Sequence, residues 1–334
     1  MKLLKNYMLI DNHNRVINYL RLAVTDRCNL RCNYCMPEEG IDFAKRKDLF
    51  SMEELCRLSS IMVSQGINKI RLTGGEPFVR KDLMVLFRHL ASLEGLDDIS
   101  VTTNATLIGP YINELKSLGI KNINVSLDAI NKDVFEKITR RNQYETVYEN
   151  LIKLISEGFN VRINCIALEG QNIEEIIPLV ELTKYYNVSV RFLEEMPFNG
   201  GSKSFNTIKW DYKAIYEHIA NRFDAIEKLV SEKTSTSINY KIKDYKGTFG
   251  LIPSFSRTFC GSCNRLRISA TGDVITCLYG KPRMNIRTLL RSENSEEKIK
   301  QHILATIGSR SKTGFEEQEK YKGVFNNSMT SIGG

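Results

Sequence analysis

Three cysteines near the start of the chain have the spacing of metal ligands. In TDRCNLRCNYCMP, Cys28 is followed by three residues, Cys32 by two residues, and then Cys35. Three thiolates can hold three irons of a [4Fe–4S] cluster and leave the fourth iron open to another ligand. A zinc site or buried structural cysteines are the alternatives. Structural zinc takes four ligands, however, and no fourth cysteine or histidine lies close by in the sequence. The motif therefore favours a cluster with one open iron.

A second group of three cysteines lies near the other end of the chain. Cys260 and Cys263 are separated by two residues, and Cys277 follows thirteen residues later. The same open-iron argument applies, with a zinc ribbon completed by a distant residue as the alternative. The spacer contains Arg265 and Arg267, which alternate on a predicted strand and form a cationic edge beside the thiols. Without the cysteines, these arginines would be interpreted as a solvated strand face.

The remaining two cysteines, Cys56 and Cys165, fall outside both groups. A free cysteine without a motif is most often a small apolar side chain of the core. We expect both to be buried core thiols.

The segments between the cysteine groups alternate in their hydrophobic period. Apolar, β-branched runs predict strands over 20–25, 69–73, 98–103, 122–127, 161–168 and 188–194. Helical spacing of apolar residues lies between them, as over 52–66, 81–93 and 146–158. This order predicts a parallel α/β sheet, and six repeats are too few for a closed eightfold barrel. We expect an incomplete (β/α)6 TIM-like barrel; an open doubly wound sheet is the alternative.

Polar and glycine residues follow the predicted strands where a ligand would bind. The first cysteine group comes directly after the first strand, and Gly74 and Gly75 after the second. Thr102 and Ser126 end the next two. Ligands of α/β proteins bind at the carboxyl ends of the strands, so these residues predict one pocket lining.

The alternation stops after residue 197. A linker rich in glycine, serine and asparagine follows, then a predicted helix over 210–223 and irregular sequence with short strands. We therefore place a domain boundary near residue 200. Residues 1–200 would form the partial barrel, and 201–334 a C-terminal extension that carries the second cysteine group.

Composition narrows the class of protein without naming a substrate. The 334 residues are 42% hydrophobic and 26% charged, which is typical of a globular protein, and the net charge is +8. No run reaches the roughly 18 apolar residues of a membrane span, and the N-terminus lacks a signal-peptide core. Clustered thiols fit a reducing compartment, so we expect a cytoplasmic protein. The basic excess fits either a nucleic acid or a small polyanion.

Taken together, the motifs resemble those of one enzyme family. The CxxxCxxC spacing with an aromatic residue before its last cysteine is the signature of radical S-adenosylmethionine (SAM) enzymes. LRLAVTDRCNLRCNYCMP, KIRLTGGEP, INVSLDA, FCGSCNRLRIS, the lone Cys277 and the terminal Gly333-Gly334 resemble the GTP 3',8-cyclase family from end to end. The resemblance implies two [4Fe–4S] clusters, SAM, and conversion of GTP to (8S)-3',8-cyclo-7,8-dihydroguanosine 5'-triphosphate, the first step of molybdenum cofactor biosynthesis.

The resemblance also implies roles for individual residues. The six clustered cysteines would be the cluster ligands, and Tyr34, Gly75, Ser126 and Met196 would contact SAM. GTP would be bound by Arg21, Arg71, Thr102, Arg162, Arg265 and Arg267. Arg265 and Arg267 would be catalytic, together with a Gly333-Gly334 tail that reaches the cavity. Arg162 stands where the family usually has lysine, which leaves its exact contact open.

The implied partners are the GTP substrate, an electron donor and a downstream cyclic pyranopterin monophosphate synthase, and a homodimer is possible. No nucleic acid or membrane is expected. One rival is a radical enzyme that modifies a peptide and carries auxiliary clusters. Such domains normally have more cysteines, and none follows Cys277. The other rival, a metal-bound module that binds nucleic acid, leaves GGEP and the polar strand ends unexplained.

Overall fold

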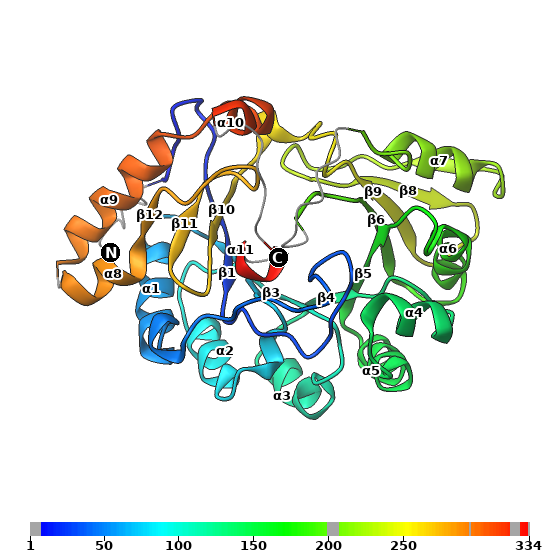
Figure 1. Cartoon of the computed structure of the whole chain (residues 1–334), viewed down its shortest axis with the longest axis horizontal. Helices are drawn as coiled ribbons and strands as arrows, with labels where there is room; N and C mark the ends of the chain where they lie inside the picture. Colours follow the sequence, from blue (N-terminus) through cyan, green and yellow to red (C-terminus); the bar gives the residue numbers. More distant parts are fainter. Residues whose placement is uncertain (1–7, 199–206, 294, 321–327, 333–334) are drawn as a thin grey trace.

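The chain forms one extended mixed sheet with helices along its outer side (Figure 1). The computed structural model describes residues 8–198, 207–293, 295–320 and 328–332. The central strands are β1 (Tyr19–Ala23), β2 (Lys69–Thr73), β3 (Asp98–Thr103), β4 (Asn122–Ser126), β5 (Asn160–Ala167) and β6 (Ser189–Glu194). These six strands confirm the six that the hydrophobic period predicted, and the partial TIM-like barrel is confirmed with them.

The C-terminal strands extend this sheet at both edges. They are β7 (Ile226–Lys228), β8 (Ile238–Ile242), β9 (Thr248–Ile252), β10 (Arg265–Ile268), β11 (Asp273–Ile275) and β12 (Met284–Asn285). The strand order is β12-β11-β10-β1-β2-β3-β4-β5-β6-β9-β8-β7. β10 pairs in parallel with β1, and β9 pairs in parallel with β6. Cys260 and Cys263 precede β10 and therefore lie at the amino end of β1, whereas the first cysteine group follows the carboxyl end of β1.

The described residues form eleven α-helices, most of which lie along the outer side of the sheet. They are α1 (Met52–Ser64), α2 (Leu83–Ala91), α3 (Ile112–Ser117), α4 (Lys132–Thr139), α5 (Tyr144–Ser156), α6 (Ile176–Tyr185), α7 (Tyr212–Ala220), α8 (Ile286–Ser292), α9 (Glu296–Gly308), α10 (Gly314–Lys320) and α11 (Met329–Ile332). α1 starts at a capping box, in which Ser51 and Glu54 each accept from the other's backbone N–H. Its buried face includes Leu55, Leu58 and Ile61.

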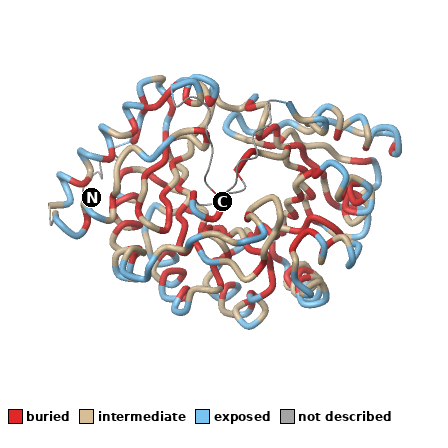
Figure 2. Tube along the Cα trace, viewed as in Figure 1, coloured by how far each residue is buried: buried red, intermediate tan, exposed pale blue. Residues whose placement is uncertain are grey.

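The core lies between the sheet and these helices, where the trace is mostly buried (Figure 2). Cys165 is fully buried, as expected, at the centre of β5. The same expectation is wrong for Cys56, which is only half-buried. Cys56 lies on α1 and packs against the edge of the core, because the helix turns its neighbour Leu55 inward instead.

The short helix α11 lies on the inner side of the sheet, away from the other helices (Figure 1). Ser328, Thr330 and Ile332 are buried, and Ile332 packs with Phe198 and Tyr279. The C-terminal segment therefore enters the concave side of the partial barrel up to residue 332. Gly333 and Gly334 lie outside the described residues.

None of the helices in the described ranges is both long and apolar enough to cross a bilayer.

Candidate active site

The concave side of the sheet holds one cavity of about 350 Å³ that is lined by both cysteine groups. Of the residues that the sequence assigned to ligand binding, the lining contains Arg21, Cys28, Cys32, Tyr34, Cys35, Arg71, Gly75, Thr102, Ser126, Met196, Cys260, Cys263, Arg265, Arg267 and Cys277. Arg162 is not among them. The structure thus gathers residues separated by some 250 positions into a single site of the size of a small-molecule pocket.

The glycines after β2 are required by close packing of two loops. A side chain on Gly74 would run into the backbone of Thr25, and one on Gly75 into the backbone of Arg27. Gly75 also donates its N–H to the Thr25 carbonyl at 2.9 Å. The GGEP turn therefore holds the start of the first cysteine loop against the end of β2.

Two buried carboxyl groups lie beside the first cysteine group. Glu76 accepts from Thr103 Oγ1 at 2.8 Å and from the Asn104 N–H at 2.6 Å, and burial raises its pKa to about 7. Asp128 accepts from Tyr34 Oη at 2.8 Å, and burial raises its pKa to about 6. The hydrogen bond to Asp128 fixes Tyr34 within the cavity.

Ser328, directly before the tail helix α11, contacts the first cysteine group. Ser328 Oγ donates to the Cys35 carbonyl at 2.7 Å and lies 3.9 Å from Cys35 Sγ. Burial raises the pKa of the Cys35 thiol, and hydrogen bonds from Ser328 and the Thr330 backbone oppose that rise. The C-terminal segment therefore completes the surroundings of the N-terminal cysteines.

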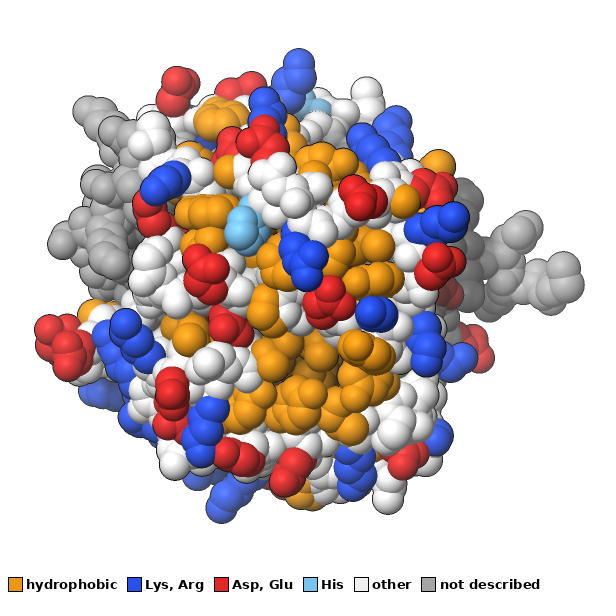
Figure 3. Space-filling view, turned by 90° about the vertical axis from the view of Figure 1, so that its right-hand side faces the viewer, with side chains coloured by type: hydrophobic (Ala, Val, Ile, Leu, Met, Phe, Trp, Pro, Cys, Tyr) orange, Lys and Arg blue, Asp and Glu red, His pale blue; other side chains and the backbone are white. Residues whose placement is uncertain are grey.

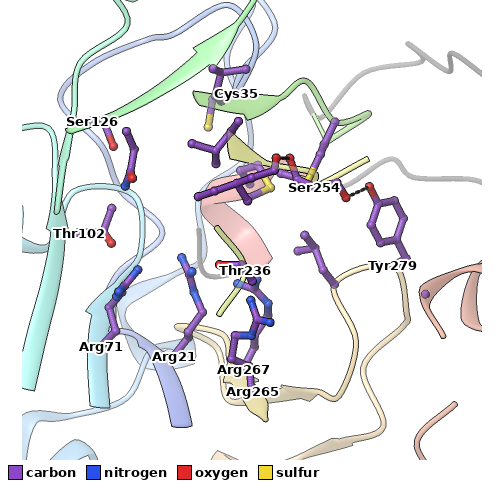
Figure 4. A pocket seen from close by; sticks show the side chains of 18 of the residues that line it. Arg21, Cys35, Arg71, Thr102, Ser126, Thr236, Ser254, Arg265, Arg267 and Tyr279 are labelled. Atoms are coloured by element: carbon purple, nitrogen blue, oxygen red, sulfur yellow. Dashed lines mark hydrogen bonds between the residues drawn. The ribbon is translucent and has the colours of Figure 1, made fainter. Parts of the chain in front are cut away.

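Arginines from neighbouring strands form a row along the floor of the cavity. In the parallel register, Arg267 on β10 lies opposite Arg21 on β1, and Arg21 lies opposite Arg71 on β2. Figure 4 shows Arg21, Arg71, Arg265 and Arg267 reaching into the same space, with Thr102 and Ser126 beyond them. Parallel strands in register place these like charges side by side, which is costly without an anion.

The electrostatic cost of this row appears in the pKa values of its members. Burial and then the neighbouring Arg265 lower the pKa of Arg267 to about 10. Burial, Arg162 and Arg71 lower that of Arg191 to about 9. A polyanionic ligand would remove this repulsion, because each guanidinium would gain a charge-assisted hydrogen bond.

Arg191 is a site residue that the sequence analysis missed. It lies on β6, lines the cavity, and has a buried Nε without a hydrogen-bond partner among the described residues. The sequence signal was an arginine inside the apolar run VSVRFLE, on a strand next to the one that carries Arg162. Arg162 lies on the same face of β5 as the lining residues Asn164 and Ile166, nearer the start of the strand, and burial and the nearby Arg71 lower its pKa.

Several other lining residues have buried polar atoms that are unpartnered within the described chain. They are Tyr19 Oη, Thr102 Oγ1, Arg257 Nη1, Arg265 Nη2 and Thr276 Oγ1. Buried polar groups are ordinarily paired, so an orphaned set around one cavity indicates a polar ligand.

The donor set fits iron–sulfur clusters better than single metal ions. Within the described part of the chain, no three Cys, His, Asp or Glu side chains converge closely enough to hold one ion. Zinc binds each thiolate at about 2.3 Å and so draws its ligands together, whereas a [4Fe–4S] cluster takes each thiolate on a different iron. The thiols of Cys260, Cys263 and Cys277 also face arginines. Despite burial, Arg265 and Arg310 lower the pKa of Cys263 to about 6, which favours the thiolate that binds metal.

The fold and the first cysteine group define a radical SAM enzyme. Residues 22–183 match the family model described as the Radical SAM superfamily, and residues 188–315 match Molybdenum Cofactor Synthesis C. SAM and one [4Fe–4S] cluster are therefore cofactors of this chain. The chain belongs to the GTP 3',8-cyclase family, because members of that family are 38% identical to it over nearly its whole length.

The relatives include the GTP 3',8-cyclase of Syntrophomonas wolfei, 38% identical over 98% of this chain and 100% of that protein. The mitochondrial GTP 3',8-cyclase of Arabidopsis thaliana is 38% identical over 98% of this chain and 84% of that protein. Molybdenum cofactor biosynthesis protein 1 of Bos taurus is 38% identical over 95% of this chain, but only 49% of that protein. The chain thus spans about half the length of the animal relatives that it matches.

Solved structures show the same fold at low sequence identity. SuiB of Streptococcus suis bound to the precursor peptide SuiA has a TM-score of 0.60 and is 16% identical, over 90% of this chain and 67% of that chain. The structure of anSMEcpe with bound AdoMet has a TM-score of 0.53 and is 13% identical, over 84% of this chain and 79% of that chain.

Proposed function

We propose that this chain is a GTP 3',8-cyclase, which converts GTP to (8S)-3',8-cyclo-7,8-dihydroguanosine 5'-triphosphate in the first step of molybdenum cofactor biosynthesis. The observation that carries the proposal is the row formed by Arg267, Arg21 and Arg71, which lies between two groups of three cysteines in one cavity. The thiols would bind the iron–sulfur clusters, and the arginines would bind the triphosphate.

The N-terminal cysteines Cys28, Cys32 and Cys35 would hold the cluster that binds SAM, and Cys260, Cys263 and Cys277 would hold a second [4Fe–4S] cluster. When bound, the first cluster and SAM supply a radical that can remove one hydrogen atom from the substrate. Tyr34, fixed by Asp128, would shape the SAM side of the cavity with Gly75, Ser126 and Met196.

The work of the chain itself is positioning. The guanidinium fork of arginine suits bidentate bonds to phosphate oxygens, so Arg21, Arg71 and Arg191 would hold the triphosphate. Arg265 and Arg267 lie close enough to the second cysteine group to interact with its thiols, and they would orient the remainder of the substrate. Thr102 lies on the opposite side of the cavity (Figure 4). A substrate held at several points presents one C–H bond to a radical and protects the others. Arg162, near the start of β5 on its cavity-facing side, would act on the triphosphate through its charge.

The catalytic role of Gly333 and Gly334 remains part of the proposal. The segment that precedes them enters the cavity and contacts Cys35, which supports a tail that reaches the reacting groups. An electron donor must reduce the first cluster, and a downstream cyclic pyranopterin monophosphate synthase would consume the product. The grouped cysteines stay free thiols only in a reducing compartment, so we propose a cytoplasmic location.

A homodimer is also proposed. Figure 3 shows hydrophobic side chains gathered on the face that carries α6 and α7, and Tyr185 of α6 is 62% exposed. A second copy that covers this face would remove apolar surface from water.

The first prediction concerns the metals. After anaerobic reconstitution the protein should contain roughly eight irons per chain, four in each cluster. Changing Cys28, Cys32 and Cys35 to Ala should remove one cluster and all cleavage of SAM. Changing Cys260, Cys263 and Cys277 to Ala should remove only the other cluster. Changing Cys56 to Ala provides the matched control and should leave both. Stoichiometric zinc at the second group, in protein purified anaerobically from iron-replete cells, would contradict the proposal.

A further inference from the structure

Arg310 is a buried arginine that directly contacts the second cysteine group. It follows α9, is only 4% exposed, and comes from a segment that no motif of the sequence analysis included. Its Nη2 donates to Cys263 Sγ at 3.4 Å, and its Nη1 donates to the Cys263 carbonyl at 3.3 Å. One guanidinium thus holds both the sulfur and the backbone of a single ligand.

Arg310 is held in place by Asp11, near the start of the chain. Asp11 Oδ2 lies 3.7 Å from Arg310 Nη1, and the Asp11 side chain is fully buried. The same carboxylate accepts from Arg15 Nε at 2.6 Å, and its Oδ1 accepts from the backbone N–H groups of His13 and Arg15. His13 Nε2 also lies 3.1 Å from the Arg310 carbonyl oxygen. The carboxylate therefore orients two arginines at once.

Arg15 extends this arrangement to a second ligand. Its Nη1 donates to the Cys260 carbonyl at 3.0 Å and to the Lys312 carbonyl at 2.8 Å, and its Nη2 donates to the Ser311 carbonyl at 2.8 Å. Three segments far apart in sequence, 11–15, 260–263 and 310–312, are thus joined behind the second cysteine group.

From these contacts we infer that Arg310 is a positioning residue that sets the reduction potential of the second cluster, with Asp11 and Arg15 holding it in place. The inference rests on the second cluster of the proposed function. Reduction adds negative charge that spreads onto the cysteine sulfurs, and a cationic N–H···S donor stabilises that charge. Arg310 therefore favours the reduced cluster and makes its potential less negative.

The first cysteine group has a different environment. Its sulfurs are approached by neutral donors, with Asn104 Nδ2 3.7 Å from Cys28 Sγ and Ser328 Oγ 3.9 Å from Cys35 Sγ. The carboxyl groups of Glu76 and Asp128 lie near it. Its one nearby guanidinium in these contacts, Arg31, donates to the Cys28 carbonyl and not to a sulfur. The charge of Arg310 is directed at the second group alone, so the two clusters should respond differently to its removal.

The experiment uses the full chain with both clusters, titrated electrochemically and followed by electron paramagnetic resonance. The variant with Cys28, Cys32 and Cys35 changed to Ala assigns the signals. At a fixed applied potential, Arg310→Met should lower the ratio of reduced to oxidised second cluster on the order of tenfold. This corresponds to a reduction potential about 59 mV more negative for one electron. The first cluster should keep its potential. Arg310→Lys, which retains the charge, should recover part of the shift, and Asp11→Asn should give a smaller shift in the same direction.

Arg57→Met is the matched control, because Arg57 is a half-buried arginine that donates to the Leu290 and Glu293 carbonyls on the outer side of the fold. It should change neither potential. A second cluster with unaltered potential and spectrum in Arg310→Met would overturn the inference while leaving the proposed function intact. If Arg310→Met does not retain the cluster, an unchanged potential in both Arg310→Lys and Asp11→Asn would overturn it. A wild-type protein whose second cysteine group binds no cluster would overturn both.

Discussion

At the scale of single residues, the cavity gathers positive charge from neighbouring strands of the sheet. Arg267, Arg21 and Arg71 lie in register on three adjacent strands. Burial and mutual repulsion lower the pKa values of Arg267 and Arg191 to about 10 and about 9. The folded chain therefore carries an electrostatic cost at neutral pH, and an anion that binds there relieves it. Selection for substrate binding commonly opposes stability in this way.

Arg191→Met should separate these two effects. Removing an uncompensated buried charge should raise the stability of the ligand-free chain by about 1 kcal/mol, as seen by denaturant unfolding. The same change should weaken GTP binding by about 1.5–3 kcal/mol, because one charge-assisted phosphate contact is lost. Guanosine, which lacks phosphates, should bind the variant and the wild type equally.

Arg88→Met provides the control for this prediction, since Arg88 is an exposed arginine paired with Glu114 on the outer surface. Arg88→Met should change the binding free energies of GTP and guanosine by no more than a few tenths of a kcal/mol. Equal weakening of GTP and guanosine in Arg191→Met would show that Arg191 is no phosphate contact.

At the scale of elements, the GGEP turn after β2 places the buried carboxyl group of Glu76 beside the first cysteine group. Burial raises the pKa of Glu76 from 4.5 to about 7, although three hydrogen bonds oppose the rise. Between these two values the folded chain binds more protons than the unfolded chain. Linkage then requires that the stability of the metal-free chain falls as the pH rises through this window.

Glu76→Gln should flatten that dependence between about pH 5 and pH 7. Its overall stability should fall, because the amide replaces one acceptor oxygen by a donor that faces an N–H or O–H group. Urea unfolding at several pH values measures both effects. Glu145→Gln, at an exposed carboxylate paired with Lys132, should leave the slope unchanged. A slope in Glu76→Gln equal to that of the wild type would refute this assignment.

The elements also show how far the sequence could predict the fold and the site. Apolar, β-branched runs separated by helical periods identified β1 to β6, because β-branched residues favour strands. The motif residues that follow these strands were therefore also correctly predicted to line one cavity. The sequence did not predict the parallel pairing of β10 with β1, since that pairing joins residues far apart in the chain. α11 was also missed, because its four polar-flanked residues are ordered by tertiary contacts and not by a helical period. The Asp11–Arg310 contact was missed for the same long-range reason, whereas Arg191 was missed although an arginine inside an apolar run marks it in the sequence.

At the scale of the whole molecule, one open barrel brings three separate segments to a common space. β1 supplies the first cysteine loop, β10 returns beside it with the second group, and α11 enters from the C-terminal end. The boundary expected near residue 200 stays a prediction. The sheet nevertheless continues through β9 and β10, so the two cysteine groups belong to one cavity.

The central claim is that this cavity couples cleavage of SAM to cyclisation of GTP. The most direct measurement is to quantify 5'-deoxyadenosine and the cyclised nucleotide side by side, in reconstituted protein supplied with SAM, GTP and a strong reductant. We predict that both form together in comparable amounts, and that changing Cys260, Cys263 and Cys277 to Ala abolishes the cyclised nucleotide. Formation of 5'-deoxyadenosine by the intact protein while GTP remains unconsumed would contradict the claim.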